Sequence, residues 1–392
     1  MTRIAFVSTY PPQLCGIATF TADLASAVGS HSVVAVQPPE PIDPYGAEVG
    51  HRIRRDVPGD YARAAAWLDA SGSDVVSIQH EYGIWGGPDG AHVLDLMRAL
   101  RTPTVATLHT ILQHPTPSQH HILAQVVRMA DATIVMSAAA AELLTRSYGV
   151  DPTRVEIVPH GVPDLPLVAP ERVKPTLGLG GRTVILSFGL LGPGKGYESV
   201  IAAMPELVRR VPDALYVIVG ATHPDLLRRE GESYRRKLET LAVSLGVAES
   251  VRFEGRFVDV HELRTWLQAA DIFVTPYPNL EQIVSGTLSY AMGAGKAIVS
   301  TPYAYARERL AQGRGLLVEP GSTDSLTRAL LRLAQDGELR RELGIRAYAD
   351  SLGMRWSEVA EGYRRVFERA ERAAPNARPS VAPAALMAAA HA

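Results

Sequence analysis

The residues best suited to chemistry lie in the second half of the chain, where an apolar strand pattern runs into a glycine-rich turn. The segment Leu186-Ser-Phe-Gly-Leu-Leu-Gly-Pro-Gly-Lys-Gly196 contains this turn, and a helix is predicted to begin near Tyr197. Free backbone amides at such a turn and the positive end of the helix dipole attract an anion, and Lys195 adds a full charge beside Gly194. This pattern favours a phosphate ligand.

Two other interpretations of this segment compete with a phosphate site. The spacing from Gly189 imitates the P-loop G-x-x-x-x-G-K, but the next residue is Gly196, so the hydroxyl that holds magnesium in a P-loop is missing. That departure disfavours an NTPase. A plain tight turn with a solvated lysine remains as the alternative.

A second polar segment, residues 276–296, also joins a predicted strand to a predicted helix. Ser285 is expected to cap that helix, leaving the amides of Gly286 and Thr287 to face an anion or a sugar hydroxyl. Glu281, in the loop before the helix, is a candidate to hold sugar hydroxyls or to face developing positive charge. The alternative is an ordinary capped helix.

The first half offers polar groups at predicted strand ends. His109 directly follows the strand 104–108, and the loop that starts at His80, Glu81 and Tyr82 follows the strand 75–79. Aromatic and hydrogen-bonding loops of this kind suit a sugar or polyol acceptor, although a buried polar network would have the same composition. Gly16, before the first helix, would let the backbone approach a ligand closely.

No metal site is expected. His114, His120 and His121 lie close in sequence, but adjacent residues do not share a helix face, and the chain has no Asp-x-Asp pair. The single cysteine, Cys15, excludes an internal disulfide and a cysteine-based zinc site, and it fits a reducing cytoplasm.

Alternating short apolar runs and amphipathic stretches must position these residues. Predicted strands of the first half are 4–8, 33–36, 75–79, 104–108, 132–136 and 155–158, and predicted helices are 16–28, 92–100, 119–129 and 138–148. Predicted strands of the second half are 183–188, 215–219, 251–253, 272–275, 297–300 and 315–318, and predicted late helices are 322–335, 338–351 and 356–370. Nearly continuous apolar strands separated by helices indicate parallel sheets covered on both faces.

The fold class that follows is α/β, with two doubly wound, Rossmann-like domains facing each other across a cleft. Open parallel sheets bind ligands at the carboxyl ends of their strands, so the site is expected in that cleft. The expected divisions are an N-terminal Rossmann-like domain 1–165, a proline-rich linker 166–182, a C-terminal Rossmann-like domain 183–354, a helix 355–372 and a disordered tail 373–392. Pattern alone fits dehydrogenases and periplasmic-type binding proteins equally well.

The charge balance and the hydropathy of the chain limit the kinds of partner that it is expected to bind. The 39 Lys and Arg residues nearly balance the 41 Asp and Glu residues, so no global field recruits nucleic acid. The chain opens on a strand pattern rather than a signal peptide, and no apolar run reaches the roughly 18 residues that a membrane span needs. A cytoplasmic protein without a transmembrane segment is expected.

Several landmarks together resemble the retaining glycosyltransferases of family four, which have the two-domain GT-B fold. They recur in the family's order over residues 1 to about 370: Tyr10-Pro-Pro12 with Gly16, Val158-Pro-His-Gly161, Gly194-Lys-Gly196, Arg252-Phe-Glu-Gly255 and Gly313-Arg-Gly-Leu-Leu-Val-Glu-Pro320. The resemblance implies that Lys195 grips the diphosphate of a nucleotide sugar and that His109 lies beside the reaction centre. It also implies that Arg256 and Phe257 border the nucleobase and that the helix from Trp356 crosses back to the first domain.

Two positions depart from the family's pattern. The arginine that usually stands five residues before the phosphate lysine is replaced by Leu190. Of the family's two glutamates seven residues apart, the ribose-binding one falls on Tyr290, and the sugar-binding one falls on Gln282 or, with a one-residue slip in the loop, on Glu281. The nucleotide is therefore expected to be held differently.

The resemblance implies a glycosyltransferase that moves a hexose from a nucleotide-diphosphate sugar to a sugar or glycoconjugate acceptor, with retention and without a metal or other cofactor. A sugar phosphorylase on the same fold and a non-catalytic nucleotide-sugar-binding relative are the alternatives. Some family members contact membranes peripherally, and this chain shows no decisive basic amphipathic helix.

Overall fold

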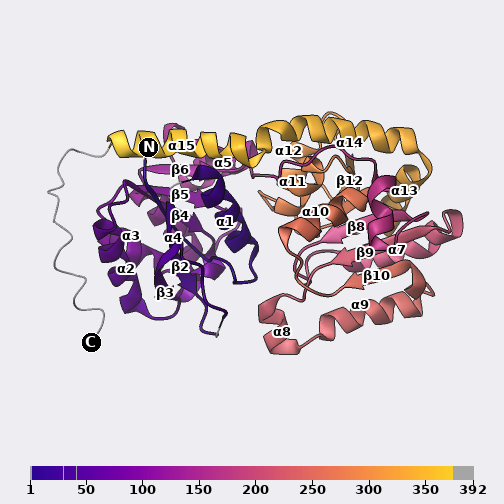
Figure 1. The fold of residues 1–392 in the computed structure, drawn as a ribbon, viewed down its shortest axis with the longest axis horizontal. Coiled ribbons are helices and arrows are strands. Elements are labelled where there is room, and N and C mark those ends of the chain that lie inside the picture. Colours follow the sequence, from indigo (N-terminus) through magenta and orange to yellow (C-terminus); the bar gives the residue numbers. More distant parts are fainter. Residues whose placement is uncertain (1, 30, 41, 374–392) are drawn as a thin grey trace. The chain divides into compact units, whose positions relative to one another are not determined.

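The computed structural model describes residues 2–29, 31–40 and 42–373, and its chain divides into two compact units. The first unit contains the residues up to Pro159 and those from Ser357 onward, and the second contains His160–Trp356 (Figure 1). Both are α/β units built on one parallel sheet, as the sequence predicted. The tail predicted to be disordered lies outside the described residues except for Ala373, which ends a helix.

The first sheet has seven strands in the order β3-β2-β1-β4-β5-β6-β7, and every neighbouring pair is parallel. Its strands are β1 (Ile4–Ser8), β2 (His31–Gln37), β3 (Val49–Arg54), β4 (Val75–His80), β5 (Thr104–Leu108), β6 (Ala132–Val135) and β7 (Val155–Ile157). Its helices are α1 (Gly16–Val28), α2 (Pro58–Ala70), α3 (Val93–Ala99), α4 (Pro117–Met129), α5 (Ala138–Tyr148) and α15 (Trp356–Ala373). The direction of winding reverses between β1 and β4, which creates a topological switch point there.

Two elements of this unit were not predicted. Strand β3 is an edge strand with mostly polar, partly exposed residues, so it lacks the apolar run that marks the other strands. Helix α2 begins with Pro58 at its first position, and its buried face consists largely of alanines. Its sequence therefore lacks the strong apolar periodicity that marks the predicted helices.

The second sheet has six strands in the order β10-β9-β8-β11-β12-β13, with its switch point between β8 and β11. Its strands are β8 (Thr183–Phe188), β9 (Ala214–Val219), β10 (Val251–Glu254), β11 (Ile272–Thr275), β12 (Ala297–Ser300) and β13 (Leu316–Leu317). Its helices are α6 (Pro170–Val173), α7 (Tyr197–Arg210), α8 (Pro224–Glu230), α9 (Ser233–Ser244), α10 (Val260–Ala269), α11 (Gly286–Gly293), α12 (Ala304–Arg309), α13 (Thr323–Gln335) and α14 (Gly337–Ser351).

Alternate side chains of β8 enter two separate cores, because successive side chains of a strand point to opposite faces. Ile185 joins a cluster with residues of α7, α9 and α13, whereas Val184 and Leu186 join a cluster with residues of α10, α11 and α12. Helices therefore cover both faces of the second sheet, as its nearly continuous apolar strands predicted.

The segment predicted as a linker, 166–182, is not a free linker but part of the second unit. It contains α6, and the ammonium of Lys174 lies 2.7 Å from the carboxylate of Asp271, with both residues buried. Asp271 also accepts the backbone N–H of Val184 at 2.7 Å. This buried pair attaches the segment to the start of β8. The proline content of the segment, on which the linker prediction rested, does not reveal this attachment.

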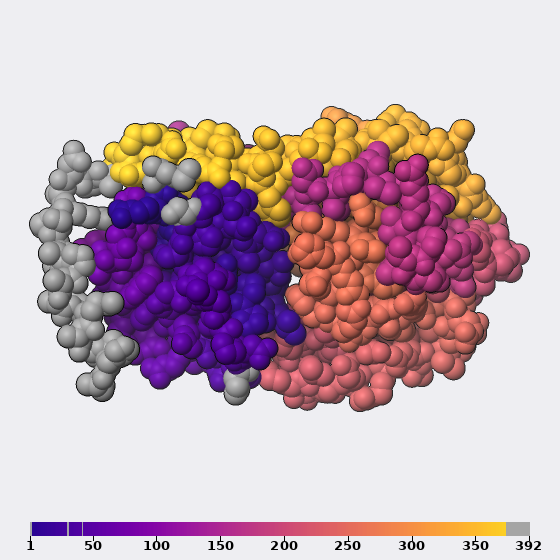
Figure 2. Space-filling model, viewed as in Figure 1, coloured from indigo at the N-terminus to yellow at the C-terminus, as the bar shows by residue number. Residues whose placement is uncertain are grey.

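Helix α15 completes the first unit. Its buried residues recur every three or four positions, at Val359, Tyr363, Val366, Phe367 and Ala370, so one apolar stripe faces the sheet. In the space-filling view its yellow residues pack directly on the indigo and purple residues of the same unit (Figure 2). No described helix is both long and apolar enough to cross a membrane.

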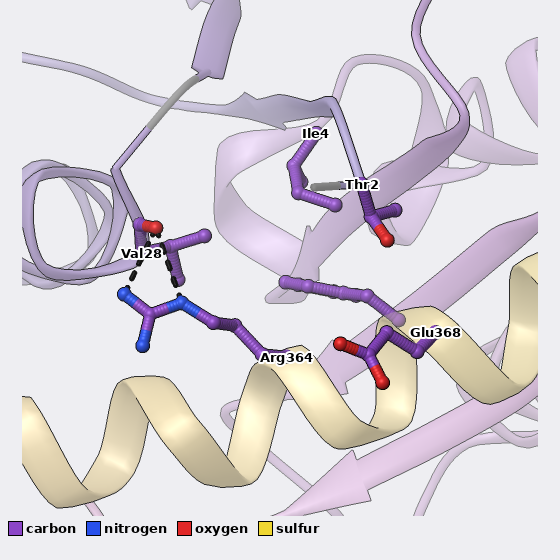
Figure 3. Close-up of a pocket in the computed structure, with 6 residues that line it drawn as sticks. Thr2, Ile4, Val28, Arg364 and Glu368 are labelled. Carbon is purple, nitrogen blue, oxygen red and sulfur yellow. Dashed lines mark hydrogen bonds between the residues drawn. The ribbon is translucent and has the colours of Figure 1, made fainter.

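The close-up in Figure 3 shows how α15 meets the end of α1. In the figure Arg364 donates to the carbonyl oxygen of Val28, from Nη2 at 3.0 Å and from Nε at 3.3 Å. Its Nη2 also donates to the carbonyl oxygen of Ala27 at 2.6 Å, so it serves carbonyl groups that the end of α1 leaves unsatisfied. The hollow beside it is lined by Ile4 and Phe367 and has a volume of about 20 Å³. That is room for about one water molecule, so it is not a substrate site.

Candidate functional site in each unit

The turn that carries Lys195 follows the carboxyl end of β8, beside the switch point of the second sheet. Gly196 has φ +74°, and a Cβ atom there would lie 2.1 Å from the carbonyl oxygen of Pro276. Only glycine fits this close approach, which packs the turn onto the backbone that leaves β11. Gly194, at φ +92°, faces open space. The predicted glycine-rich turn is therefore present and tightly held against the backbone after β11.

Lys195 is half-buried and lies over an aromatic ring rather than beside an acid. Its Nζ is 4.7 Å from the centroid of the Tyr277 ring. No carboxylate of the described residues forms an ion pair with it. The charge of this ammonium is thus not neutralised by a neighbouring acid.

The amino end of α11 lies at the same edge of the sheet, after β11. The Ser285 hydroxyl accepts the N–H of Leu288 at 3.3 Å, which confirms the predicted N-cap. Thr287 packs on the turn, since its Cγ2 lies 3.6 Å from where a Cβ of Gly189 would be. Gly286 lies against His160, whose Nε2 would be 2.8 Å from a Cβ at that position. The structure therefore brings Lys195, Ser285, Gly286 and Thr287 to one edge of one sheet.

The predicted ribose position is occupied by a buried aromatic residue. Tyr290 is 7% exposed, and its ring centroid lies 6.2 Å from Phe188 and 6.1 Å from His160. Burial lowers the pKa of His160 to about 4, despite the opposing hydrogen bond with the carbonyl of Gly161. A neutral, largely apolar surface stands where the family's pattern has a carboxylate.

Gln282 and Glu281, the two candidates for the sugar-binding position, make different hydrogen bonds within the loop. Gln282 donates from its side-chain nitrogen to the carbonyl of Val284 at 2.9 Å, so its amide is used within the loop. Glu281 is partly exposed, and its backbone N–H donates to the side chain of Asn279 at 3.0 Å. The structure therefore places both side chains in the loop before α11 and fixes the Gln282 amide within that loop.

The two predicted base-pocket residues are both exposed, after β10. The Arg256 guanidinium forms a bidentate ion pair with Glu262, which raises its pKa. Phe257 is 41% exposed. The phenyl ring is thus available for stacking, whereas Arg256 is engaged by its own acid.

In the first unit, His109 follows β5 and is fixed by a residue that the sequence did not single out. Gln79, fully buried in β4, lies with Oε1 2.9 Å from His109 Nε2. Its amide nitrogen donates to Ser77 Oγ at 3.2 Å. Because an amide oxygen only accepts, His109 donates from Nε2 in this hydrogen bond. Phe20 packs edge-on against the imidazole with a centroid separation of 4.9 Å.

The three predicted acceptor residues lie at the end of β4 but differ in access. His80 is 0% exposed, neither ring nitrogen has a hydrogen-bond partner among the described residues, and burial lowers its pKa to about 4. Tyr82 is also buried, and its hydroxyl donates to the carbonyl of Gln119 at 3.3 Å. His80 and Tyr82 therefore build the core under the loop and do not present their rings to an acceptor.

Glu81 remains as the accessible acceptor candidate. It is partly exposed; burial raises its pKa, opposed by hydrogen bonds from the Thr110 hydroxyl and from the N–H groups of Tyr82 and Gly83. These donors fix the carboxylate at the carboxyl edge of the first sheet. Gly16 lies at the same edge, exposed at the first position of α1, and a Cβ atom added there would meet no other atom within 4 Å.

Three residues that hold the candidate site residues were given no role in a site by the sequence analysis: Gln79, Tyr277 and His160. Gln79 and Tyr277 stand at or just beyond strand ends, which is the signal that would have found them, whereas the position of His160 against α11 depends on the fold. Within residues 2–29, 31–40 and 42–373, no three His, Cys, Asp or Glu side chains are grouped to hold a metal.

Fold and site together define the class: a protein of two parallel-sheet α/β domains with a glycine-rich, lysine-bearing turn at the switch point of the second. Residues 16–164 match the family model described as Glycosyltransferase Family 4, and residues 171–350 match the model described as Glycosyl transferases group 1. The chain therefore belongs to the group 1 glycosyltransferases of GT-B architecture and is a glycosyltransferase.

Named relatives and solved structures agree with this family. The chain is 28% identical to the D-inositol 3-phosphate glycosyltransferase of Nocardia farcinica, over 83% of this chain and 70% of the relative. It is 28% identical to the phosphatidyl-myo-inositol mannosyltransferase of Mycolicibacterium smegmatis, over 83% and 78%. The fold matches sucrose-phosphate synthase from Thermosynechococcus elongatus, with a TM-score of 0.78 and 18% identity over 94% of this chain and 99% of that one. It also matches HepE of Anabaena in complex with UDP-glucose, with a TM-score of 0.73 and 18% identity over 94% and 99%.

Proposed function

We propose that this glycosyltransferase moves a hexose from a nucleotide-diphosphate sugar to a hydroxyl of a sugar or polyol-containing acceptor, with retention of anomeric configuration. The observation that carries the proposal is the grouping of Lys195 with the amino end of α11 at the β8–β11 switch point. A lysine and unsatisfied helix amides stabilise the negative charge that develops on a departing diphosphate.

The remaining roles follow from position. Glu281 would orient the donor sugar, and His109, held by Gln79, would be the catalytic histidine. Glu81 would accept hydrogen bonds from acceptor hydroxyls. Two named relatives act on inositol 3-phosphate and phosphatidyl-myo-inositol, so inositol phosphates are the first acceptors to test. The single cysteine is consistent with work in a reducing cytoplasm.

The first experiment identifies the donor. A thermal-shift screen against UDP, GDP, ADP and their sugars should give a ligand that raises the unfolding temperature, because binding to the folded state alone stabilises it. Turnover with that donor and inositol 3-phosphate, followed by NMR of the anomeric proton, tests transfer and retention. An inverted product would contradict the stereochemical part of the proposal.

Lys195→Ala tests the phosphate site. Loss of a charge that acts on the leaving group should lower kcat/KM about 100-fold or more, as removal of comparable transition-state stabilisers does. Lys237→Ala, at an exposed lysine of α9, is the matched control and should keep full activity. A Lys195→Ala enzyme with unchanged kcat/KM would remove the central support of the proposal.

A sugar phosphorylase is the rival activity, favoured by the single lysine and by Tyr290 where a ribose carboxylate would stand. Phosphate-dependent cleavage of a disaccharide, with no turnover of any nucleotide sugar, would decide for it.

A further inference from the structure

Tyr277 links the lysine turn to the amino end of α11. It lies two residues beyond β11, is 4% exposed, and stands between Pro276 and Pro278. One face of its ring carries the Lys195 ammonium at 4.7 Å, and its hydroxyl lies 2.8 Å from the Thr287 hydroxyl. One side chain therefore contacts both parts of the candidate phosphate site.

The backbone and the ring of Tyr277 are held by their surroundings. Its carbonyl oxygen accepts the Thr301 hydroxyl at 2.6 Å, and its ring stacks on Tyr303 with centroids 5.4 Å apart and an interplanar angle of 18°. The flanking prolines restrict the backbone on both sides. A ring fixed in this way can set the position of a flexible lysine.

A π face and a carboxylate would hold this lysine with different consequences. A carboxylate at ion-pair distance would neutralise the ammonium and compete with a phosphate, whereas an aromatic face attracts the cation through its quadrupole and leaves the full charge in place. Lys195 has the ring contact, and the described residues give it no carboxylate partner. The contact thus reduces the entropy that a four-carbon side chain loses when it binds an anion.

The hydroxyl of Tyr277 extends the arrangement into the helix. Thr287 Oγ1 lies 2.8 Å from Tyr277 Oη and 3.2 Å from Oγ of Ser285, the N-cap of α11. The three hydroxyls form a chain from the ring beneath Lys195 to the first turn of α11.

We propose that Tyr277 is the positioning residue of the phosphate site: its ring holds Lys195 ready for a diphosphate, and its hydroxyl fixes that lysine relative to the amino end of α11. The inference rests on the proposed function, because it assumes that Lys195 binds the diphosphate of the donor.

Calorimetric titration with UDP, GDP, ADP and pyrophosphate measures the effect on diphosphate binding. Tyr277→Leu removes the ring and should lower the affinity for the diphosphate about fivefold. That factor corresponds to one cation–π contact of roughly 1 kcal/mol. Tyr277→Phe keeps the ring and removes only the hydroxyl, so its affinity should stay within about twofold of wild type. If Phe weakens binding as much as Leu does, the ring is not what holds the lysine, and the proposal is overturned.

A double-mutant cycle with Lys195→Met separates positioning from a general loss of structure. If Tyr277 acts through Lys195, Tyr277→Leu should have no further effect on affinity once the lysine is gone. Equal weakening in both backgrounds would overturn the inference and leave the proposed function intact, provided that Lys195→Met alone weakens binding. A Lys195→Met variant with wild-type affinity, or a wild-type chain that binds none of the four probes, would overturn both.

Should Tyr277→Leu unfold because a buried ring is lost, the Phe variant and Lys195→Met still decide the matter. In that case the proposal stands only if Phe binds the diphosphate like wild type and its effect on the unfolding free energy couples to that of Thr287→Val. Additive effects of Tyr277→Phe and Thr287→Val on the unfolding free energy would overturn the link to α11.

Discussion

At the residue scale, the chemistry of both units depends on side chains that are held by neutral partners. Lys195 lies on a tyrosine ring, and His109 is hydrogen-bonded to the amide of Gln79. Neutral partners fix a side chain without adding an opposite charge beside it, as a substrate-binding group requires. Other polar side chains at strand ends are buried away from any ligand, and the clearest example is His80, which is fully buried.

Gln79→Leu should lower kcat about fivefold, because the loss of one hydrogen bond worth roughly 1 kcal/mol frees the His109 ring to rotate. In a His109→Ala background the same substitution should change kcat very little, since its effect passes through the imidazole. Steady-state kinetics of the two single variants and the double variant measure this. Full additivity would show that Gln79 acts elsewhere.

Buried histidines should make the protein sensitive to acid. The pKa of His80 is about 4 in the folded state, below the ordinary value of 6.5, so between these values the unfolded chain takes up a proton that the folded chain refuses. The unfolding free energy should therefore fall as the pH drops from about 6.5 towards 4, by on the order of 3 kcal/mol for this group.

His80→Leu should remove that part of the pH dependence. At pH 7 the variant should be about as stable as wild type, because the replaced ring nitrogens have no partner to lose. His160, whose pKa is also lowered to about 4, remains in the variant and supplies the residual slope. Urea unfolding at several pH values measures both, and an unchanged slope would contradict the assignment.

At the element scale, short segments between sheet and helix carry most of the positioning. The turn at Gly196 packs on the backbone after β11, and the segment 170–177 is tied to β8 through Lys174 and Asp271. The elements that hold the candidate phosphate site are consequently fixed from both sides of the switch point.

Lys174→Met should destabilise the second unit by about 3–5 kcal/mol, because it leaves the Asp271 carboxylate buried without its cation. Adding Asp271→Asn should recover much of that loss, since the amide oxygen can still accept the Val184 N–H. Urea denaturation measures the change in unfolding free energy, and native-state hydrogen exchange of the β8 amides shows whether the change falls in the second unit. Equal stability of Lys174→Met and wild type would show that the pair does not anchor the segment.

At the scale of the whole molecule, the first unit is discontinuous in sequence. Its sheet comes from the first 159 residues, and its last helix, α15, arrives from beyond residue 356. The ring of Phe367 meets Phe6 at 6.2 Å, and the Tyr363 hydroxyl lies 3.3 Å from Thr107 of β5, two residues before His109. The end of the chain thus supports the sheet that positions the histidine.

Phe367→Ala should destabilise the first unit by about 3–5 kcal/mol, the cost of truncating a fully buried aromatic side chain. Arg365→Ala, one helix position before Val366 and exposed, should change stability by no more than about 0.5 kcal/mol. Thermal unfolding of both variants tests this. A Phe367→Ala protein as stable as the Arg365→Ala control would mean that α15 is not needed for the first unit.

The sequence by itself determined the two parallel-sheet domains, most strand positions and the lysine turn, because buried parallel strands and glycine-rich turns follow from local composition. It also indicated the Ser285 cap and the family. It missed β3 and α2, whose residues lack a clear apolar pattern, and it took 166–182 for a linker because the Lys174–Asp271 pair joins residues 97 positions apart. Only the tertiary structure decided which strand-end side chains are accessible. It buried His80, Tyr82 and Tyr290 and placed Tyr277 under Lys195, since burial and ring contacts depend on neighbours that are distant in sequence.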